Sequence, residues 1–404
     1  MKILGINISH DGSSCLLEDN EIKYLTDDER FNRIKHYAPG DSDGHLFESG
    51  KFKVAFAEEL LKYTSHVDYI IFSSFQRFQE ESDESNTDDV LIKGYLNSLK
   101  EFGITWGEVI FEEQNHHIYH ASSGFYGSGF DEAVALILDG CGTIYQNYED
   151  VEDLLGEGTR NCFREVESIF KVDYKSGITP LWRNFAWNES SIRSAEPQPR
   201  DVFAEKYGNN VLSSSLSCGM LFNLMATLLG FEDGRNAGKV MGMSSYYDEN
   251  QYFAYSEYPE LDPRWWRKID WFTEVDDTWV TTRELCEKLA DEQPFGHEDD
   301  SQEHSDFIIN CDVANKLQEE TLKHTKRLIT KAVEISGCKN VVLSGGYFLN
   351  CLNNYQYLDI DPEINFYVDP VCYDGGTALG AAKWLYYKLT KSTEKNPLTS
   401  LYLS

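Results

Sequence analysis

The sequence predicts an α/β protein made of two related halves. A short apolar strand followed by an Asp-Gly turn appears near the N-terminus, at residues 3–12, and again at residues 133–140. Self-similarity of this kind indicates an internal duplication. Towards the C-terminus strands alternate with helices, which is typical of a mainly parallel sheet. At 404 residues and 41% hydrophobic content, the chain can bury a sizeable core.

The first half opens with a strand, a sharp turn and a second strand. The apolar run at residues 3–8 is followed by a polar turn at residues 9–14 and another apolar run at residues 15–17. An Asp-Gly pair between two apolar runs is a strong hairpin signal. The same order returns at residues 133–145, around Asp139-Gly140. We therefore predict two β-turn-β units, one opening each half.

A long helix and two further strands are predicted in the second half. Apolar residues recur at helical spacing over residues 312–336, and Gly337 is placed to cap the C-terminus of that helix. Strands follow at residues 341–343 and 364–368, and a last helix is expected to end near residue 389.

On this basis the chain divides into two lobes and a tail. Residues 1–150 form the N-terminal lobe, residues 151–389 the C-terminal lobe and residues 390–404 the tail. We expect the first phosphate-binding turns and the histidine metal ligands in the N-terminal lobe. The C-terminal lobe is expected to carry the ATP-binding glycine loops.

Composition disfavours several classes of protein. A net charge of −32 repels phosphate backbones, which counts against tight, sequence-independent binding to nucleic acids. The nine cysteines include no C-x-x-C pair, so a thiolate zinc cluster is not expected and a metal site must use histidine and carboxylate. No apolar run approaches the length of a membrane span, and the first apolar run is too short for a signal peptide. We expect no membrane association and a cytoplasmic location.

Three of the ten histidines, His116, His117 and His120, lie within five residues. Because positions 116 and 120 are one helical turn apart, both imidazoles project from one helix face and can reach one ion. Divalent metals accept imidazole and carboxylate ligands together, and Asp139 lies one predicted strand further on. Asp374, in the last glycine-rich turn, is the natural fourth ligand. The alternative is that the H-x-x-x-H pair consists only of hydrogen-bonded polar side chains.

Four glycine-containing turns, at residues 11–14, 139–143, 344–346 and 374–377, each follow an apolar strand. Small residues let backbone N–H groups point at an anion, and a helix that starts behind the loop adds its dipole. None is a Walker loop or a G-x-G-x-x-G fingerprint, so the nucleotide-binding class must be a different one. One such turn is usually only a turn, but four together predict phosphate binding.

Two cationic segments are further candidates for binding an anion. Lys239 lies between glycines in Gly238-Lys239-Val240-Met241-Gly242. Residues 29–36 form a basic island in an acidic chain, for which ordinary surface charge is an equally good explanation.

Taken in order, these segments resemble the O-carbamoyltransferase family of antibiotic-tailoring enzymes (tobramycin, novobiocin and cephamycin type). That family is related to the hydrogenase-maturation carbamoyltransferase and to the tRNA threonylcarbamoyl transferases. The resemblance covers residues 1–389. In the first part of the chain the matching segments are Ile3-Leu4-Gly5-Ile6 with His10-Asp11, Glu29-Arg30-Phe31 with Lys35-His36, His116-His117-Ile118-Tyr119-His120-Ala121, and Leu138-Asp139-Gly140. In the second part they are Gly238-Lys239-Val240-Met241-Gly242, Leu343-Ser344-Gly345-Gly346 with Leu349-Asn350-Cys351, and Asp374-Gly375-Gly376. The family pattern is not matched at residues 236–239 and 244–247.

The resemblance implies a duplicated actin/Hsp70-like (ribonuclease H-like) fold with two lobes. It implies an iron ion, or manganese or zinc in its place, held by His116, His120, Asp139 and Asp374. The family makes carbamoyladenylate from carbamoyl phosphate and ATP, and then passes the carbamoyl group to a hydroxyl group. The residues implied to contact ATP or carbamoyladenylate are Arg33, Gly140, Lys239, Ser344, Gly345, Gly346, Asn350, Gly375 and Gly376. The residues expected near the reacting group are His10, Asp11 and Lys35, with His10 as general base.

Partners and acceptor follow less directly. Family members commonly continue with a second domain that makes the adenylate, and this chain is expected to lack it. Three alternatives stay open: a partner protein supplies carbamoyladenylate, the activation chemistry is absent or rearranged, or the chain is a pseudoenzyme subunit that only a partner activates. Association of two copies of this chain as a homodimer is also left open. The acceptor is either a small natural-product alcohol or the hydroxymethyl group of a modified pyrimidine, as a nucleotide or in DNA. The net charge favours a small molecule or a nucleotide.

Two other functions remain open at this point. A tRNA threonylcarbamoyl transferase fits residues 29–36 and 349–351 less well than the O-carbamoyl branch does. A nucleotide-binding regulator or a sugar-kinase-like protein could use the same scaffold, but a kinase needs no histidine pair.

Overall fold

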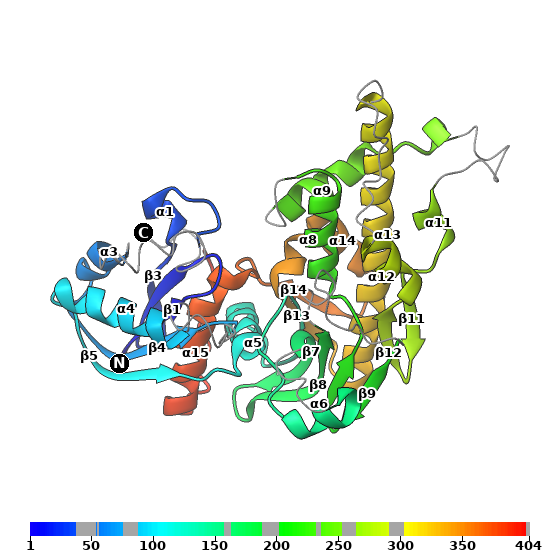
Figure 1. The fold of residues 1–404 in the computed structure, drawn as a ribbon. Coiled ribbons are helices and arrows are strands. Elements are labelled where there is room, and N and C mark those ends of the chain that lie inside the picture. The colour runs from blue at the N-terminus through cyan, green and yellow to red at the C-terminus, as the bar shows by residue number, and fades with distance from the viewer. Residues whose placement is uncertain are drawn as a thin grey trace.

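The computed structural model describes residues 1–37, 54, 56–75, 88–156, 163–187, 202–231, 236–252, 264–290 and 303–400. Within these ranges the chain forms two large sheets flanked by helices, together with one small two-stranded ribbon (Figure 1).

The first sheet has five strands in the order β3-β2-β1-β4-β5. These strands are β1 (Lys2–Asn7), β2 (Ser13–Glu18), β3 (Glu21–Asp27), β4 (His66–Ser73) and β5 (Thr105–Phe111). β1 lies in the centre, and its run of buried residues is typical of a strand covered on both faces. It pairs with β2 as the predicted antiparallel hairpin and with β4 in parallel.

The second sheet has seven strands in the order β14-β13-β6-β7-β8-β10-β9. They are β6 (Glu132–Leu138), β7 (Phe163–Asp173), β8 (Gly177–Trp187), β9 (Ala204–Tyr207), β10 (Asn210–Ser213), β13 (Asn340–Ser344) and β14 (Asn365–Val368). The order β8-β7-β6-β13-β14 repeats the order of the first sheet, with the same strand directions at every pairing. The predicted duplication of an α/β unit is therefore confirmed.

Two details of the sequence prediction were wrong. Residues 139–145 do not form a tight hairpin, because the backbone N–H groups of Gly142 and Tyr145 bond to the start of β7, and α6 (Tyr148–Leu155) precedes the antiparallel partner strand. The sheets are also mixed rather than mainly parallel. The first three strands of each unit pair antiparallel, since the hairpin connections β1-β2, β2-β3 and β7-β8 are too short for a parallel crossover.

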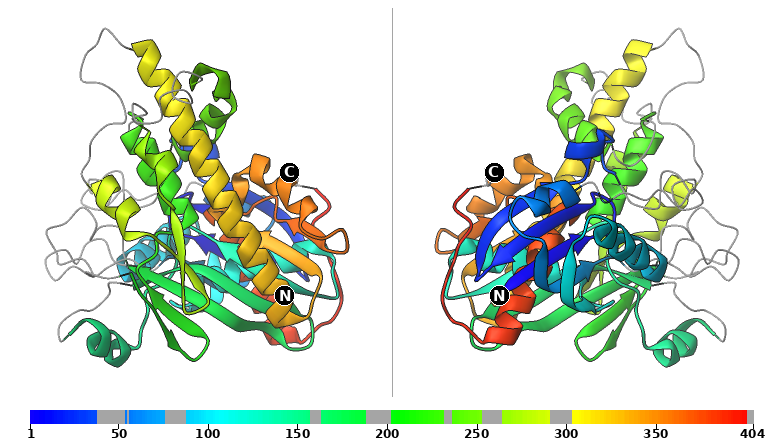
Figure 2. Two further views of the ribbon diagram at one scale, coloured as in Figure 1. Left: turned by 90° about the vertical axis from the view of Figure 1, so that its right-hand side faces the viewer. Right: turned by 90° about the vertical axis from the view of Figure 1, so that its left-hand side faces the viewer.

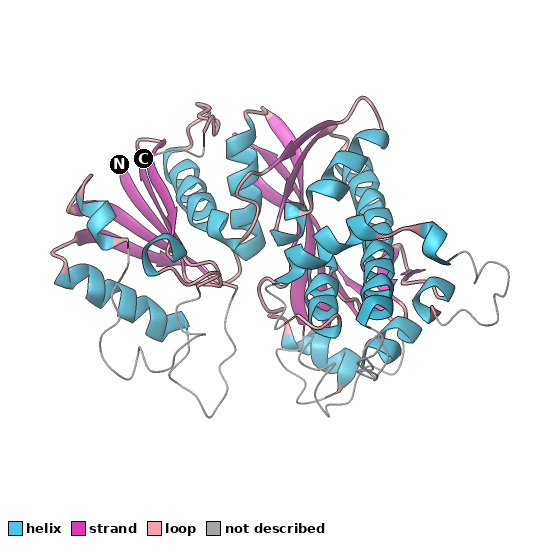
Figure 3. Ribbon diagram, turned by 90° about the horizontal axis from the view of Figure 1, so that it is seen from above, coloured by secondary structure: helices cyan, strands magenta, loops and turns pink. Residues whose placement is uncertain are grey.

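Two helices lie between the sheets, as the view from above shows (Figure 3). α5 (His116–Ser128) follows the first sheet but packs through Ala121 and Phe125 on the second. α15 (Thr377–Thr390) follows the second sheet but packs through Ala381 and Leu385 on the first. Each half thus donates its last helix to the other half.

The long helix α13 (Glu303–Ser336) covers the opposite face of the second sheet (Figure 2). It includes the helix predicted over residues 312–336 and begins earlier. Alternating residues of β6 face opposite ways: Val134 and Leu136 belong to the core that contains α13, and Ala135 and Ile137 to the core that contains α5.

Shorter elements complete the chain. They are α1 (Glu29–Asn32), α3 (Ala57–Leu61), α4 (Asp88–Glu101), α8 (Cys218–Leu228), α9 (Ala237–Met243), α11 (Trp265–Lys268), β11 (Phe272–Val275), β12 (Thr278–Thr281), α12 (Arg283–Ala290) and α14 (Cys351–Gln356), with short 3-10 helices that include η7 (Gly346–Leu349) and η9 (Asp374–Gly376).

Strand β6 already belongs to the second sheet, so the change from one sheet to the other lies between residues 111 and 132, upstream of residue 150. Residues 391–400 run along both lobes: the backbone N–H of Leu398 donates to Gly127, and the Asn396 amide to the carbonyl of Asn20. None of the helices in the described ranges has the length and apolar character needed to cross a bilayer.

Candidate metal centre

Two imidazoles and two carboxylates meet where α5 and α15 begin. The potential ligand atoms of His116, His120, Asp139 and Asp374 all lie within 4.8 Å of one another, and all four residues are buried. The His116 Nε2 atom is 3.2 Å from Asp139 Oδ2, and His120 Nε2 is 3.5 Å from Asp374 Oδ1. The four residues singled out from the sequence therefore form one cluster.

The fold explains this meeting. His116 and His120 occupy the first turns of α5, where their rings stack edge to face with centroids 4.9 Å apart. Asp139 follows the last residue of β6, and its Oδ1 accepts a hydrogen bond from the backbone N–H of Gly346 at 3.1 Å. Asp374 opens the short 3-10 turn η9 ahead of α15, so the duplication places its carboxylate opposite the start of α5.

The charges in the cluster are strongly coupled. Burial lowers the pKa of His116, but the charges of Asp374 and Asp139 outweigh burial and raise the pKa to about 10. Burial and Asp374 raise the pKa of Asp139, but the hydrogen bond with His116 and the neighbouring imidazoles lower it to about 2. The pKa of Asp374 also lies well below its usual range, because His10 and His116 outweigh the effect of burial. Two buried, ionised carboxylates thus require positive charge beside them.

The unpartnered atoms of the cluster fit a bound cation. Both ring nitrogens of His120 and Oδ1 of Asp374 are buried without a hydrogen-bond partner. Such orphaned polar atoms are costly and rare in native proteins. Imidazole and carboxylate donors together suit iron, manganese or zinc. Among the described residues this is the one group of His, Cys, Asp and Glu side chains that could hold a metal ion.

His10 and Asp11 lie beside the cluster, on the turn between β1 and β2. The half-exposed His10 ring places Nδ1 3.3 Å from Asp374 Oδ2. Burial lowers the pKa of His10, but Asp374 and Asp11 outweigh it and raise the pKa. Asp11 adopts the left-handed backbone conformation (φ 57°), and its Oδ1 is 2.7 Å from Nδ1 of His36. Asn7 supports this turn, because its amide donates to the carbonyls of His10 and Asp11.

Several supporting residues were not predicted. The Ser9 hydroxyl donates to Asp374 Oδ2 at 2.6 Å. His117 faces away from the cluster, with Nδ1 2.9 Å from the Ser168 hydroxyl and 3.4 Å from Glu165 Oε1. Burial lowers the pKa of His117 to about 4, so its ring is neutral at pH 7. The adjacent His116-His117 pair was visible in the sequence, but no local pattern marks Ser9 or Glu165, which act through long-range contacts.

The glycine loops lie next to the cluster. Ser344-Gly345-Gly346 follows β13, and a Cβ added to Gly345 would lie 2.2 Å from the carbonyl oxygen of Leu138. The backbone φ at Gly345 is +102°, a conformation that side chains with a Cβ rarely adopt. Both the steric clash and the backbone conformation therefore require glycine at this position. The backbone of Gly375 accepts from the Ser13 hydroxyl, which joins the loop at residues 374–376 to β2.

Other residues expected at a nucleotide are placed as follows. The Ser344 hydroxyl donates to Asp369. The Asn350 side chain is buried, pairs with the Gln318 amide and caps α14. Both side chains are thus already hydrogen-bonded within the protein. Lys239 is exposed on α9, with its ammonium 5.4 Å from the centre of the Phe231 ring. The remaining positions are Gly140, packed against α8, and Arg33 and Lys35, exposed after α1.

A family model described as the carbamoyltransferase N-terminus matches residues 104–383, a range that contains all four residues of the cluster. This chain belongs to the carbamoyltransferase family. The match begins within the first unit and runs to α15.

Two curated proteins with sequences similar to this chain are longer than it is. The nodulation protein NolNO of Sinorhizobium fredii is 24% identical over 97% of this chain and 48% of its own length. The uncharacterized protein sll1178 of Synechocystis is 24% identical over 96% of this chain and 57% of its own length. The chain thus spans about half the length of the curated proteins that it matches.

Solved structures show the same fold. Full-length HypF matches with a TM-score of 0.51 at 15% identity, over 97% of this chain and 56% of HypF. HypF from T. kodakarensis matches with a TM-score of 0.52 at 12% identity, over 96% of this chain and 48% of that protein. The expected duplicated actin/Hsp70-like fold is confirmed by this likeness together with the repeated strand order.

Proposed function

We propose that this chain transfers a carbamoyl group to a hydroxyl acceptor in a metal-dependent reaction, with carbamoyl phosphate and ATP as the source of the activated group. The observation that carries the proposal is the meeting of two imidazoles and two carboxylates in a member of the carbamoyltransferase family. The HypF structure that shares this fold was obtained in a phosphate- and nucleotide-bound form, which supports the nucleotide part of the proposal.

The metal would be held by His116, His120, Asp139 and Asp374, with iron as the first choice and manganese or zinc as alternatives. When bound, the ion supplies positive charge for the phosphate oxygens of the donor and for the charge that develops during transfer.

His10 is the proposed general base. Its ring is half exposed, so an acceptor hydroxyl can approach it, and Asp374 and Asp11 lie on either side of it. In the transfer step the acceptor O–H bond breaks as its proton passes to His10. The acceptor oxygen forms a bond to the carbamoyl carbon, and the bond from that carbon to the phosphate oxygen of the adenylate breaks. The electron pair of that bond leaves on the phosphate. Lys35 and His36, on the loop after α1, are proposed to help hold the donor.

The donor would lie against the glycine loops at residues 344–346 and 374–376. Supporting evidence is the start of α15 at Thr377, directly behind the second loop, which has no side-chain cap. A cavity of about 460 Å³ lined by Lys239, Met243, Tyr246 and Phe307 offers a cation and aromatic rings, and we assign it to the nucleoside end of the donor.

The test combines metal analysis with product detection. Purified chain is incubated with labelled carbamoyl phosphate, ATP and Fe²⁺, Mn²⁺ or Zn²⁺, and candidate alcohols and nucleosides are screened by mass spectrometry for a carbamoyl mass gain. A parallel arm with preformed carbamoyladenylate shows whether this chain makes the adenylate itself. The double variant His116→Ala/His120→Ala is expected to lose both bound metal and product.

The matched control is His66→Ala. His66 is exposed, and its ring hydrogen-bonds to the Thr105 hydroxyl at the edge of the first sheet. Loss of this ring should leave metal content and activity unchanged. Full activity in the double variant would contradict the metal assignment. Wild-type chain that binds metal but carbamoylates nothing from either donor would contradict the transferase assignment.

A further inference from the structure

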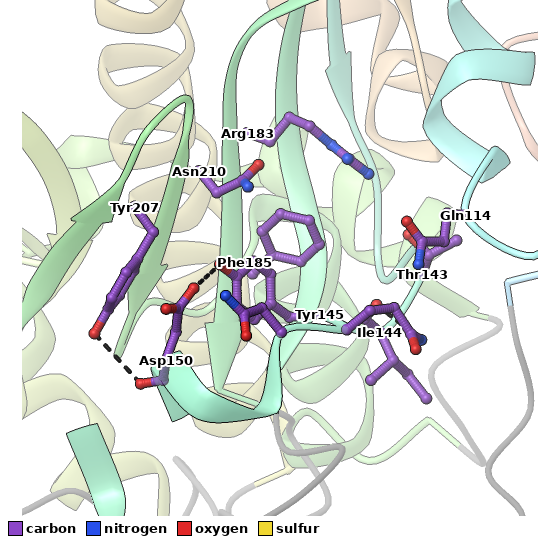
Figure 4. A pocket seen from close by; sticks show the side chains of 11 residues that line it. Gln114, Thr143, Ile144, Tyr145, Asp150, Arg183, Phe185, Tyr207 and Asn210 are labelled. Atoms are coloured by element: carbon purple, nitrogen blue, oxygen red, sulfur yellow. Dashed lines mark hydrogen bonds between the residues drawn. The ribbon is translucent and has the colours of Figure 1, made fainter. Parts of the chain in front are cut away.

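A second cavity, of about 450 Å³, is lined mainly by residues of the second sheet and of the loop that follows β6 (Figure 4). Its walls come from the loop after β6, from α6, and from strands β8, β9 and β10. The volume falls within the range of small-molecule pockets, roughly 300–1,000 Å³. Of its lining residues, only Thr143 belongs to a segment that the sequence marked as a candidate binding site, the glycine-containing turn at residues 139–143.

Two lining residues belong to the segments that carry the metal-ligand candidates. Gln114 lies two residues before His116, and Thr143 lies four residues after Asp139. Figure 4 shows Gln114 and Thr143 together at one end of the cavity and Tyr207 at the other. A molecule that lies across the cavity therefore points one end toward the segments that carry two of the metal-ligand candidates.

One layer of side chains separates the cavity wall from the histidine helix. The guanidinium of Arg183 donates two hydrogen bonds to Glu165, at 2.6 and 2.8 Å. On its other side Glu165 meets His117 and accepts from the Thr143 hydroxyl at 3.2 Å. The pairing also neutralises the charge of Arg183, because Glu165 is buried and its pKa, despite burial, is held at about 2 by Arg183 and His117.

The remaining lining is uncharged apart from Asp150, whose carboxylate accepts from the Tyr145 hydroxyl. Phe185 and Tyr145 form an aromatic wall with ring centroids 4.9 Å apart, and Arg183 lies over Phe185. Four carboxamides, Gln114, Gln146, Asn147 and Asn210, are distributed around this wall. Each carboxamide offers both a donor and an acceptor, which is what a ligand rich in hydroxyl groups requires. The described lining contains no cation without a carboxylate partner, so a phosphate group finds no counter-charge there.

We propose that this cavity binds the carbamoyl acceptor, and that the acceptor is an uncharged ring bearing hydroxyl groups. Its apolar face lies on Phe185, its polar edge meets the carboxamides, and the hydroxyl to be modified points toward Gln114 and Thr143. Two kinds of molecule share this chemistry: a sugar or cyclitol, and a hydroxymethyl-pyrimidine nucleoside. This inference rests on the proposed transferase function and extends it to the class of acceptor.

The experiment compares Asn210→Ala and Phe185→Leu with the control Asn209→Ala. Asn209 is the neighbouring residue of the same type, exposed and outside the cavity lining. Saturation-transfer NMR is run with myo-inositol, methyl α-glucopyranoside, 5-hydroxymethyldeoxycytidine and its 5′-monophosphate as probes. We expect at least one uncharged probe to bind, with affinity reduced about tenfold in the two cavity variants, the equivalent of one hydrogen bond or stacking contact. Asn209→Ala should behave as wild type, and the monophosphate should bind more weakly than its nucleoside.

Steady-state kinetics with the probe that binds give a second readout. The cavity variants should raise KM for the acceptor about tenfold while metal content stays at the wild-type level. Failure of every uncharged probe to bind, or tighter binding of the monophosphate, overturns the inference. Product formation with an unchanged KM in both variants overturns it while leaving the transferase function intact. If an uncharged probe binds in a way that depends on Asn210 but no carbamoyl product forms, the cavity assignment stands and the transferase proposal fails.

Discussion

At the scale of single residues, His10 is the group whose role can be separated from that of the metal ligands. It contacts Asp374 through Nδ1 but is half exposed, whereas the four clustered residues are buried. Removing the ring should therefore affect proton transfer more than ion binding.

Replacing His10 with Gln is expected to lower kcat by about 10²–10⁴, the usual contribution of a general base. The metal content, measured by mass spectrometry of the purified protein, should remain at the wild-type level. Activity above about a tenth of wild type would remove His10 from the base role, since a positioned base contributes more than that.

Asp28 makes stability depend on pH. Burial raises the pKa of this carboxyl to about 7, against the opposing hydrogen bond from Tyr95, and Asp27 adds to the effect. The folded state therefore holds a proton that the unfolded state releases near pH 4. Stability contributed by this proton is complete below pH 4 and is lost as pH rises through 7.

The isosteric variant Asp28→Asn cannot ionise, so it should gain stability relative to wild type between pH 5 and pH 8. The expected gain is a few kcal/mol, at ~1.4 kcal/mol per pKa unit, measured as free energy of unfolding in urea at the two pH values. The exposed residue Asp359 provides the control, because Asp359→Asn should change the free energy of unfolding by the same amount at both pH values. A wild-type–variant difference independent of pH would show that Asp28 is already ionised in the folded state.

At the scale of elements, the crossing of α5 and α15 sets the geometry of the site. A Cβ added to Gly380 would lie 1.9 Å from the carbonyl oxygen of Tyr119, and the Ser122 hydroxyl donates to the Gly380 carbonyl. The two helices touch backbone to backbone at this point. His120 on one helix and Asp374 at the start of the other owe their separation to that contact.

Gly380→Ala should force the helices apart. We expect a destabilisation of roughly 1–3 kcal/mol or more from overpacking and a loss of metal affinity, measured by thermal unfolding and by metal titration. Gly238→Ala is the matched control, because an added Cβ there meets nothing within 4 Å and lies in helix α9. That substitution should be neutral or slightly stabilising. Equal stability and metal affinity in both variants would show that the helix crossing does not set the site.

At the scale of the whole molecule, charge and lobe contacts decide what can approach the site. Arg164 of β7 donates to the carbonyls of Phe75, which follows β4 of the first sheet, and of Gly142. Phe75 also lies near the His10 ring, with centroids 6.3 Å apart. This contact ties the two lobes together beside the proposed base.

The net charge of −32 predicts weak retention of DNA. In fluorescence anisotropy at about 50 mM salt, a duplex containing 5-hydroxymethylcytosine should not bind at micromolar protein, a concentration at which even nonspecific binders associate. DNA binding that falls steeply with added salt would reveal a local basic groove. The proposed acceptor would then be a base in DNA instead of a free small molecule.

Much of this arrangement could be predicted from local sequence. The spacing of His116 and His120 placed both rings on one helix face, and the apolar strands before Asp139 and before the loop of Asp374 indicated that these carboxylates follow strands. The duplication was visible because an Asp-Gly turn after an apolar strand appears in each half. The tight hairpin at residues 139–145 was wrong, because the partner strand β7 comes from beyond α6.

The sequence by itself determined the family, the duplicated α/β plan and the four side chains of the cluster, since each depends on short-range periodicity or on motifs in order. Only the tertiary structure decided that α5 and α15 pack on each other's sheets and that the Ser9 hydroxyl supports Asp374. It also decided that Arg183, in the wall of the second cavity, pairs with Glu165. These features depend on contacts between residues far apart in the chain. The positions of such residues follow from packing and hydrogen bonding across elements, for which no local pattern exists.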